Sequence, residues 1–199
     1  MVPINPKKLS GNWFQGYALD VHTTESTFLG SGEYGHYVFN TKRSAIGELM
    51  YRLKHKSDKV ALDEIIDTAA DFLRSKWKIV TAIDAIIPVP PSKPRVFQPV
   101  LEIGKGLGSS LKIPFHDDLI VQIKETLQLK GVYEYDERLQ LLKDAFAVKS
   151  NAMKGKSVLL FDDLFRLRAM LNAISGILVE QGGVRNVYVL TLTKTRSKG

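Results

Sequence analysis

The stretch VLLFDDLFRLRAM (residues 158–170) decides the class of fold. Four apolar residues run directly into two adjacent aspartates, Asp162 and Asp163, and a loop and a helix over 169–181 are expected to follow. A strand that is apolar on both faces is typical of the buried interior of a parallel sheet. In open sheets of this kind, ligands bind at the carboxyl ends of the strands. The stretch therefore predicts a buried strand with a ligand site at its end.

The segments around this stretch repeat the strand–helix–strand pattern. Residues 83–89 form an apolar run that prolines stop, and VRNVYVLTLTKT (184–195) is a third apolar run. Amphipathic spacing predicts helices over 46–53 and 62–73, the first with Thr41 or Ser44 as its N-cap. Such alternation predicts an α/β fold, with a mainly parallel twisted sheet and helices on both of its faces.

The glycine-rich piece GKGLG (104–108) lies inside a further predicted helix over 98–111. Its spacing is GxGxG rather than GxGxxG, and no strand directly precedes it. The sequence also lacks the GxxxxGK[ST] pattern of a phosphate-binding loop. We therefore expect a helix weakened by glycines and no dinucleotide site.

The N-terminal part differs in character from the rest. Residues 11–40 hold two aromatic-rich pieces separated by glycine, serine and threonine, which predicts a β-hairpin or meander at the edge of the domain. We therefore divide the chain into an elaboration over 1–43 and an α/β domain over 44–199. Its aromatic residues either pack the hairpin onto the core or form a stacking platform for bases; they are Trp13, Phe14, Tyr17, Tyr34, Tyr37 and Phe39.

Composition narrows the function classes. The net charge of +7 attracts polyanions, which suits a phosphorylated small molecule or a nucleic acid, or serves solubility alone. The absence of cysteine excludes disulfides, thiolate catalysis and cysteine-ligated zinc, and the four histidines show no metal-binding spacing. No apolar run is long enough to span a membrane, and the N-terminus lacks the apolar core of a secretory signal. We expect a cytoplasmic protein without membrane partners.

Chemistry is expected at two strand ends. Burying an unpaired carboxylate near a core costs free energy, so at least one of Asp162 and Asp163 should bind a ligand. The carboxylates would accept hydrogen bonds from ribose hydroxyls or hold Mg²⁺ through water. Alternatively, one of them could cap the following turn. The loop PVPPSKPR places Lys93 and Arg95 beside Ser92, where the cations suit phosphate or are merely solvated. The following helix N-terminus also favours a phosphate.

Together these segments resemble a known family. VLLFDDLFRLRAM, with its helix, Gly-Gly stop and returning strand, resembles the phosphoribosyl-pyrophosphate motif of type I phosphoribosyltransferases. IPVPPSKPRVFQPV, KETLQLKGVYEYDERLQLLKDAFAV and GELMYRLKHKSDK are similar to segments of the ComF branch, which is named for competence and DNA uptake. The similarity spans roughly residues 44 to 196, and the mobile-arm motif is matched by Lys124, Thr126, Gln128 and Arg138.

The resemblance implies a role for each segment. Asp162 and Asp163 would contact the ribose hydroxyls, and the arm over 116–146, with Lys124 and Arg138, would close over the reaction centre. The ligand would be phosphoribosyl pyrophosphate with Mg²⁺, and the reaction that of a glycosyltransferase of nucleotide metabolism, in which a nitrogen acceptor displaces pyrophosphate. The 5′-phosphate loop would be Leu164, Phe165, Arg166, Leu167, Arg168, Ala169 and Met170, and the pyrophosphate loop Pro91, Ser92, Lys93, Pro94 and Arg95.

Two departures from the family pattern leave two functional hypotheses. The chain has no cysteine zinc ribbon, and the phosphate loop reads Leu167, Arg168, Ala169, Met170 where the family has a small or hydroxyl residue, Gly, any residue and Thr. Each lost donor could cost ~1–3 kcal/mol of binding, unless Arg166 or Arg168 pairs with the phosphate. The protein is either an active or formerly active phosphoribosyltransferase, or a catalytically inactive binding or regulatory module linked to DNA uptake or processing. Weak nucleic-acid binding and a homodimer are further partner hypotheses, and the acceptor is not determined.

Overall fold

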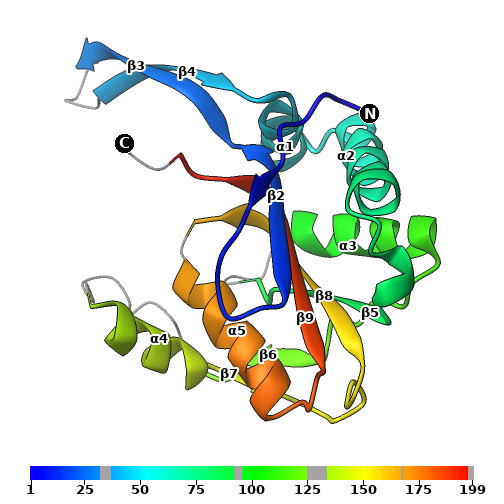
Figure 1. Ribbon diagram of the computed structural model, residues 1–199. Helices are drawn as coiled ribbons and strands as arrows, with labels where there is room; N and C mark the ends of the chain where they lie inside the picture. The colour runs from blue at the N-terminus through cyan, green and yellow to red at the C-terminus, as the bar shows by residue number, and fades with distance from the viewer. Residues whose placement is uncertain (32–36, 92–95, 125–133, 167, 197–199) are drawn as a thin grey trace.

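A five-stranded sheet forms the centre of the computed structural model, which describes residues 1–31, 37–91, 96–124, 134–166 and 168–196. Its strand order is β1-β2-β9-β8-β5 (Figure 1). Neighbours from β2 to β5 run parallel, and only β1 pairs antiparallel, with β2. The prediction of a mainly parallel sheet is confirmed. The strands are β1 (Lys7–Lys8), β2 (Gln15–Val21), β5 (Ala85–Pro88), β8 (Ser157–Phe165) and β9 (Asn186–Lys194).

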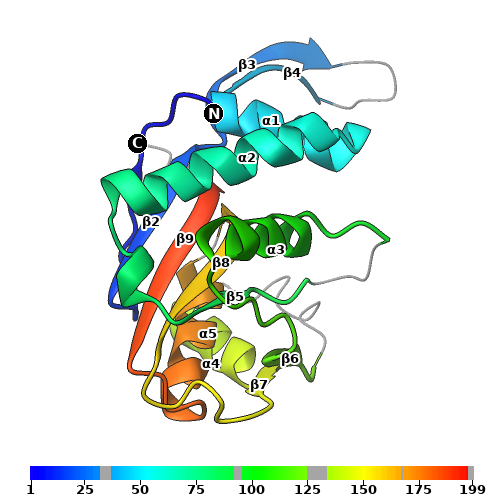
Figure 2. The same cartoon turned by 90° about the vertical axis from the view of Figure 1, so that its right-hand side faces the viewer.

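Helices cover both faces of this sheet, as predicted. In Figure 2, α1 (Ala45–Lys56), α2 (Lys59–Asp71) and α3 (Pro99–Leu111) lie in front of the strands, while α5 (Arg168–Glu180) and α4 (Tyr135–Lys143) lie behind them. Each face has its own buried apolar cluster. Successive residues of β8 alternate between the two clusters, because side chains of a strand point to opposite faces in turn.

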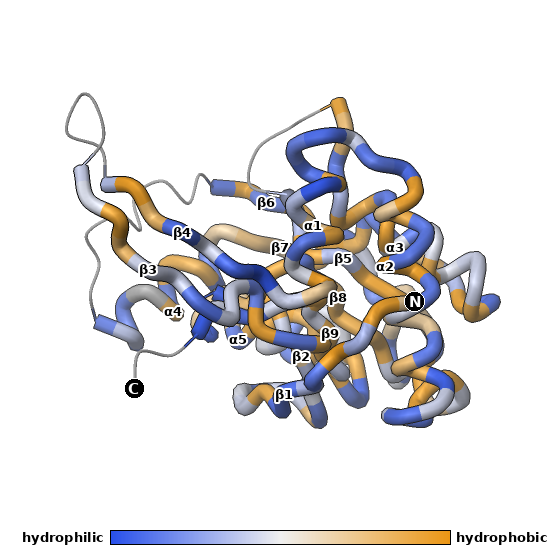
Figure 3. Tube along the Cα trace, turned by 90° about the horizontal axis from the view of Figure 1, so that it is seen from above, coloured by the Kyte–Doolittle hydropathy of each residue, from blue (hydrophilic) through white to orange (hydrophobic). Residues whose placement is uncertain are grey.

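Side-chain caps define the start of the first two helices. The Ser44 hydroxyl accepts the N–H of Gly47 at 3.1 Å and donates to the Val21 carbonyl at 2.6 Å, which ties α1 to the end of β2. At α2, the Asp58 carboxylate accepts two backbone N–H groups of the first turn, and the αL conformation of Ser57 separates the helices. The cap at Ser44 is one of the two predicted alternatives. Hydrophobic and hydrophilic residues alternate along these helices (Figure 3).

The glycines of α3 serve close packing. A Cβ at Gly106 would lie 2.2 Å from Cδ1 of Ile66 on α2, and one at Gly104 would lie 2.4 Å from the ring of Phe115. The glycines therefore let α2 and the chain after α3 approach the helix closely. The expected glycine-containing helix is confirmed over Pro99–Leu111.

One strand of the N-terminal part belongs to the central sheet, in addition to the predicted hairpin. Strands β3 (Thr23–Ser31) and β4 (Tyr37–Arg43) form an antiparallel hairpin that projects from the sheet (Figure 1). An N-terminal hairpin is confirmed, and β2 pairs antiparallel with β1 on one side and parallel with β9 on the other, so it also belongs to the central sheet. The reason is burial on both faces: Ala18 and Leu19 are both fully buried. The central sheet therefore crosses the predicted boundary at residue 43.

The excursion over 116–146 forms a small unit on the α5 side. Strands β6 (Ile120–Gln122) and β7 (Phe146–Val148) pair antiparallel and flank α4, while residues 125–133 lie outside the described part. Lys143 of α4 pairs with Glu180 of α5 at 2.8 Å. Across the described residues, none of the helices combines the length and apolarity needed to cross a membrane.

Candidate functional site

The candidate site lies at the carboxyl end of β8. The first five residues of this strand are buried, and exposure begins at Asp162. A cavity of about 280 Å³ opens there, between the end of β5, the first turn of α3 and the start of α5. Its lining consists of Lys54, Val89, Pro90, Pro91, Gln98, Pro99, Val100, Asp162, Asp163 and Met170.

Lys54 reaches the cavity from the last turn of α1 and forms an ion pair with the carboxylate of Asp163. The side chains of Lys54 and Asp163 are 30% and 16% exposed, so the pair is only partly shielded from water. The sequence interpretation missed Lys54 because it placed this residue in a polar, solvated helix end. A signal was present: Lys54 follows the buried Met50 by four residues, which puts both on the same helix face.

Asp162 differs from its neighbour in protonation. Its Oδ1 accepts the backbone N–H of Asp163 at 2.8 Å. Burial, reinforced by the charge of Asp163, raises the pKa of Asp162 to about 8, against the opposing effects of this hydrogen bond and of Lys54. With this pKa, Asp162 is mainly a neutral acid at pH 7 and can both donate and accept, whereas the ionised Asp163 only accepts. The two acids therefore offer different hydrogen-bonding chemistry.

His22 supports the backbone of Asp163 through Thr193. The Thr193 hydroxyl donates to the Asp163 carbonyl at 3.2 Å and lies 3.3 Å from Nδ1 of His22. Because this hydroxyl has one hydrogen, Nδ1–H of His22 is then the donor to Thr193. Burial, followed by the charges of Lys54 and Arg43, lowers the pKa of His22, while Asp163 opposes the shift. Sequence spacing does not reveal this role of His22, because its contact with Thr193 joins segments far apart in the chain.

The predicted 5′-phosphate loop is shorter than expected. Leu164 and Phe165 belong to β8, where they pair with Thr193 and Lys194. Phe165 packs edge-on against Trp13, with ring centroids 6.4 Å apart, which keeps the chain extended beyond the acids. Arg166 follows β8 directly, and Leu167 lies outside the described residues.

The remaining residues of the predicted 5′-phosphate loop differ in burial and in whether they line the cavity. Met170 lines the cavity, and Ala169 is buried in the core beneath α5. Arg166 and Arg168 are exposed, do not line the cavity, and have no partner in the described part of the chain.

The remaining predicted site residues are only partly placed. Pro91 lines the cavity, whereas Ser92, Lys93, Pro94 and Arg95 lie outside the described residues. Lys124 is exposed beside β7 and is not part of the cavity lining. Arg138 belongs to α4, and its side chain lies outside the described part.

Both acids have partners within the described part of the chain. The part of the chain that the structure describes contains no group of three or more His, Cys, Asp or Glu residues that could hold a metal. In addition, the Lys54 ammonium occupies Asp163, and the raised pKa keeps Asp162 mainly protonated. Binding of Mg²⁺ at this acid pair, directly or through the ligand, therefore stays a prediction.

Comparison with known proteins finds similarity in solved structures alone. No protein-family model matches the sequence, and no curated protein matches it. Adenine phosphoribosyltransferase from Leishmania donovani is 16% identical at a TM-score of 0.49, over 96% of this chain and 75% of that one. The enzyme from Leishmania tarentolae is 14% identical at a TM-score of 0.48, over 96% and 94%. The UMP synthase of Leishmania donovani is 15% identical at a TM-score of 0.42, over 84% of this chain, which spans 28% of that protein.

Proposed function

We propose that the protein is phosphoribosyltransferase-like and binds phosphoribosyl pyrophosphate in the cavity beside Asp162 and Asp163. The observation that carries this proposal is geometric: Asp162 and Asp163 line a cavity at the point where the buried part of a central parallel strand ends. The two ribose hydroxyls are neighbouring groups that both donate and accept hydrogen bonds. A neutral Asp162 can donate to one of them, and Asp163 can accept from either.

The cavity also has features that favour the charged ends of this ligand. Pro99 and Val100 belong to the first turn of α3, and Met170 belongs to the first turn of α5. Helix N-termini attract anions through free N–H groups and the helix dipole. Lys54 adds a positive charge that can turn from Asp163 to a phosphate once the ribose hydroxyls occupy the acid. We expect Mg²⁺ to enter with the pyrophosphate of the ligand.

The reaction that fits this arrangement is transfer of the phosphoribosyl group to a nitrogen acceptor. The nitrogen lone pair attacks C1 of the ribose, the bond from C1 to pyrophosphate breaks, and the pyrophosphate oxygen keeps the bonding electrons. The nitrogen then loses a proton to solvent. Lys54 and the helix N-termini would stabilise the leaving anion, so catalysis would rest on charge stabilisation and exclusion of water.

Titration calorimetry with phosphoribosyl pyrophosphate and Mg²⁺ tests the binding proposal. We expect saturable binding to the wild-type chain and binding weakened about tenfold or more in the Asp163→Asn variant, which loses a charged acceptor. Asp67→Asn is the matched control, because Asp67 is exposed on α2 and lies outside the cavity. Absence of binding to a folded wild-type chain would refute the proposal.

A second candidate is a catalytically inactive binding or regulatory module linked to DNA uptake or processing. Met170 lines the cavity at the position where the family pattern has a hydroxyl donor, and the exposed Arg166 and Arg168 do not reach the cavity lining. The net charge of +7 suits a polyanionic partner. This candidate predicts DNA retention that falls steeply with salt and survives Asp162→Asn with Asp163→Asn. No retention at low salt would discard it.

The altered loop allows a direct comparison of the two candidates. Replacing Leu167→Ser, Arg168→Gly and Met170→Thr restores the family pattern. If the restored loop binds phosphoribosyl pyrophosphate more tightly than the wild type does, the natural loop weakens ligand binding, as the inactive-module candidate requires. If the wild type already binds tightly and the restored loop does not change the affinity, the result favours the active transferase. A homodimer and a cytoplasmic location stay predictions, to be measured by sedimentation and by cell fractionation.

A further inference from the structure

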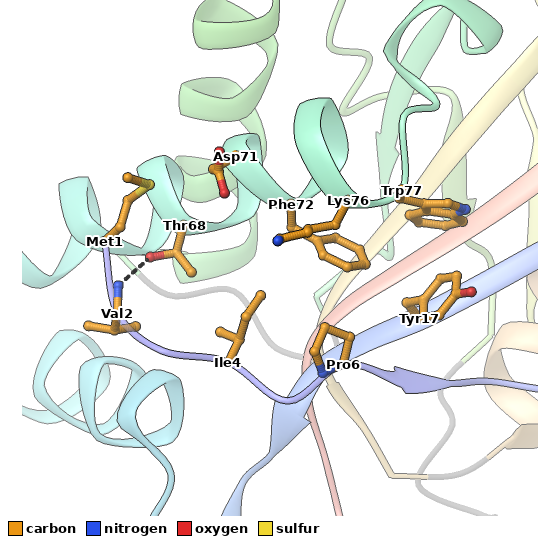
Figure 4. A pocket seen from close by; sticks show the side chains of 10 residues that line it. All are labelled: Met1, Val2, Ile4, Pro6, Tyr17, Thr68, Asp71, Phe72, Lys76 and Trp77. Carbon is orange, nitrogen blue, oxygen red and sulfur yellow. Dashed lines mark hydrogen bonds between the residues drawn. The ribbon is translucent and has the colours of Figure 1, made fainter.

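A second cavity, of about 490 Å³, lies between the N-terminal segment and the end of α2 (Figure 4). It shares no lining residue with the cavity beside the acid pair. Its volume lies in the range of roughly 300–1,000 Å³ that is usual for small-molecule sites. The lining residues are Met1, Val2, Ile4, Pro6, Tyr17, Thr68, Asp71, Phe72, Lys76 and Trp77.

The N-terminal segment is held in place as one wall of this cavity. The N–H of Val2 donates to the Thr68 hydroxyl at 3.1 Å, and the N–H of Asn5 donates to the Asp20 carboxylate at 3.1 Å. Val2 and Ile4 also pack against the buried cluster below α1, α2 and α3. The wall is therefore attached through both backbone and side chains.

A π-helical turn builds the opposite wall. Residues Phe72–Lys76 continue α2 as a π-helix, and the N–H of Trp77 donates to the Phe72 carbonyl, five residues back, at 2.9 Å. This turn brings the rings of Phe72 and Trp77 to a centroid distance of 5.9 Å, and Tyr17 lies 4.9 Å from Trp77. Trp77 is fixed further by its Nε1–H, which donates to Gln15 Oε1 at 2.9 Å. Turns of this kind are rare and frequently occur at functional sites.

Two charged side chains line the cavity, the acid Asp71 and the cation Lys76. Figure 4 shows both on the helical stretch that also carries Phe72. Lys76 has no hydrogen-bond or ion-pair partner in the part of the chain that the structure describes. Asp71, in contrast, already accepts a hydrogen bond from the Ser75 hydroxyl at 2.9 Å. The cavity thus combines apolar and aromatic walls with one ammonium group that has no partner among the described residues.

We propose that this cavity binds a small molecule with a flat aromatic body and a single carboxylate. The ring would lie between Ile4 and Pro6 on one side and Phe72 on the other. Its edge would meet the faces of the aromatic wall, an arrangement that aromatic pairs prefer. The carboxylate would pair with the Lys76 ammonium at the rim. This site is independent of the ribose ligand.

Titration calorimetry of the full chain with 2-naphthoate tests the proposal, and 2-naphthylmethylammonium is the counterpart of opposite charge. We expect saturable binding of the carboxylate and at least tenfold weaker binding of the ammonium compound. Lys76→Gln should weaken the binding of 2-naphthoate roughly tenfold, because it removes a charge-assisted hydrogen bond. Lys59→Gln is the matched control, since Lys59 is exposed on the same helix and does not line the cavity. That variant should bind like the wild type.

Two further variants separate cavity shape from loss of fold. Ile4→Trp should fill the cavity and abolish binding, whereas Ile4→Val keeps it open and should retain binding, with thermal unfolding of both variants as the check of folding. Asp163→Asn should bind 2-naphthoate as the wild type does. Failure of the folded wild type to bind, equal binding of both probes, equal effects of Lys76→Gln and Lys59→Gln, or loss of binding in Asp163→Asn would each overturn the proposal.

Discussion

Asp162 should make the stability of the folded chain depend on pH between about 4 and 8. Burial raises the pKa of Asp162 from an ordinary value of 3.8 to about 8. The folded chain thus binds this proton more tightly than the unfolded chain, so its stability is highest below the unfolded pKa and falls as pH rises through the folded pKa. A rise of about 4 pKa units, at 1.36 kcal/mol per unit, sets an upper limit of roughly 6 kcal/mol. Because part of Asp162 faces the cavity, we expect about 2–4 kcal/mol.

Urea unfolding of the wild type and of Asp162→Asn, from pH 5 to pH 9, measures this effect. The amide has a similar shape and does not ionise, so the stability of the variant relative to the wild type should rise between pH 5 and pH 9 by about 1–2 kcal/mol. Asp67→Asn serves as the control, because Asp67 is exposed on α2 and should leave the pH profile unchanged. Parallel profiles of wild type and Asp162→Asn over the whole range would refute the reasoning.

Three further predictions concern contacts on the α1–α3 side of the sheet. Lys54→Gln removes a charge that lowers the pKa of His22, so the His22 resonance should titrate at higher pH in NMR spectra; an unchanged midpoint would contradict the geometry. Gly106→Ala should lower the free energy of unfolding by about 1–2 kcal/mol, because the clash of the new Cβ with Ile66 outweighs the gain in helix propensity. Ile66→Val removes the Cδ1 atom that clashes, so the double variant should recover most of the lost stability. Asp58→Ala should lower the melting temperature, because the first turn of α2 loses its N-cap; no change would argue against the two cap hydrogen bonds.

The sequence alone determined the elements whose signal is local. The apolar runs that form β5, β8 and β9 and the amphipathic stripes of α1 and α2 were readable because burial imposes a short repeat on neighbouring residues. The end of the buried part of this strand at Asp162 and Asp163 followed from the same pattern, although β8 continues to Phe165. Parallel pairing of the last strands also follows from alternation of strands and helices.

The tertiary structure decided what depends on distances between segments far apart in the chain. The aromatic piece at the N-terminus reads as a hairpin at the edge of the domain, yet β2 also pairs with β9 of the central sheet, and packing on both sides of the sheet buries Ala18 and Leu19. Lys54 reads as a solvated charge, yet the packing of α1 on the sheet brings it to Asp163. The raised pKa of Asp162 likewise depends on desolvation by surrounding segments. No local pattern encodes these through-space effects, and they set the chemistry of the site.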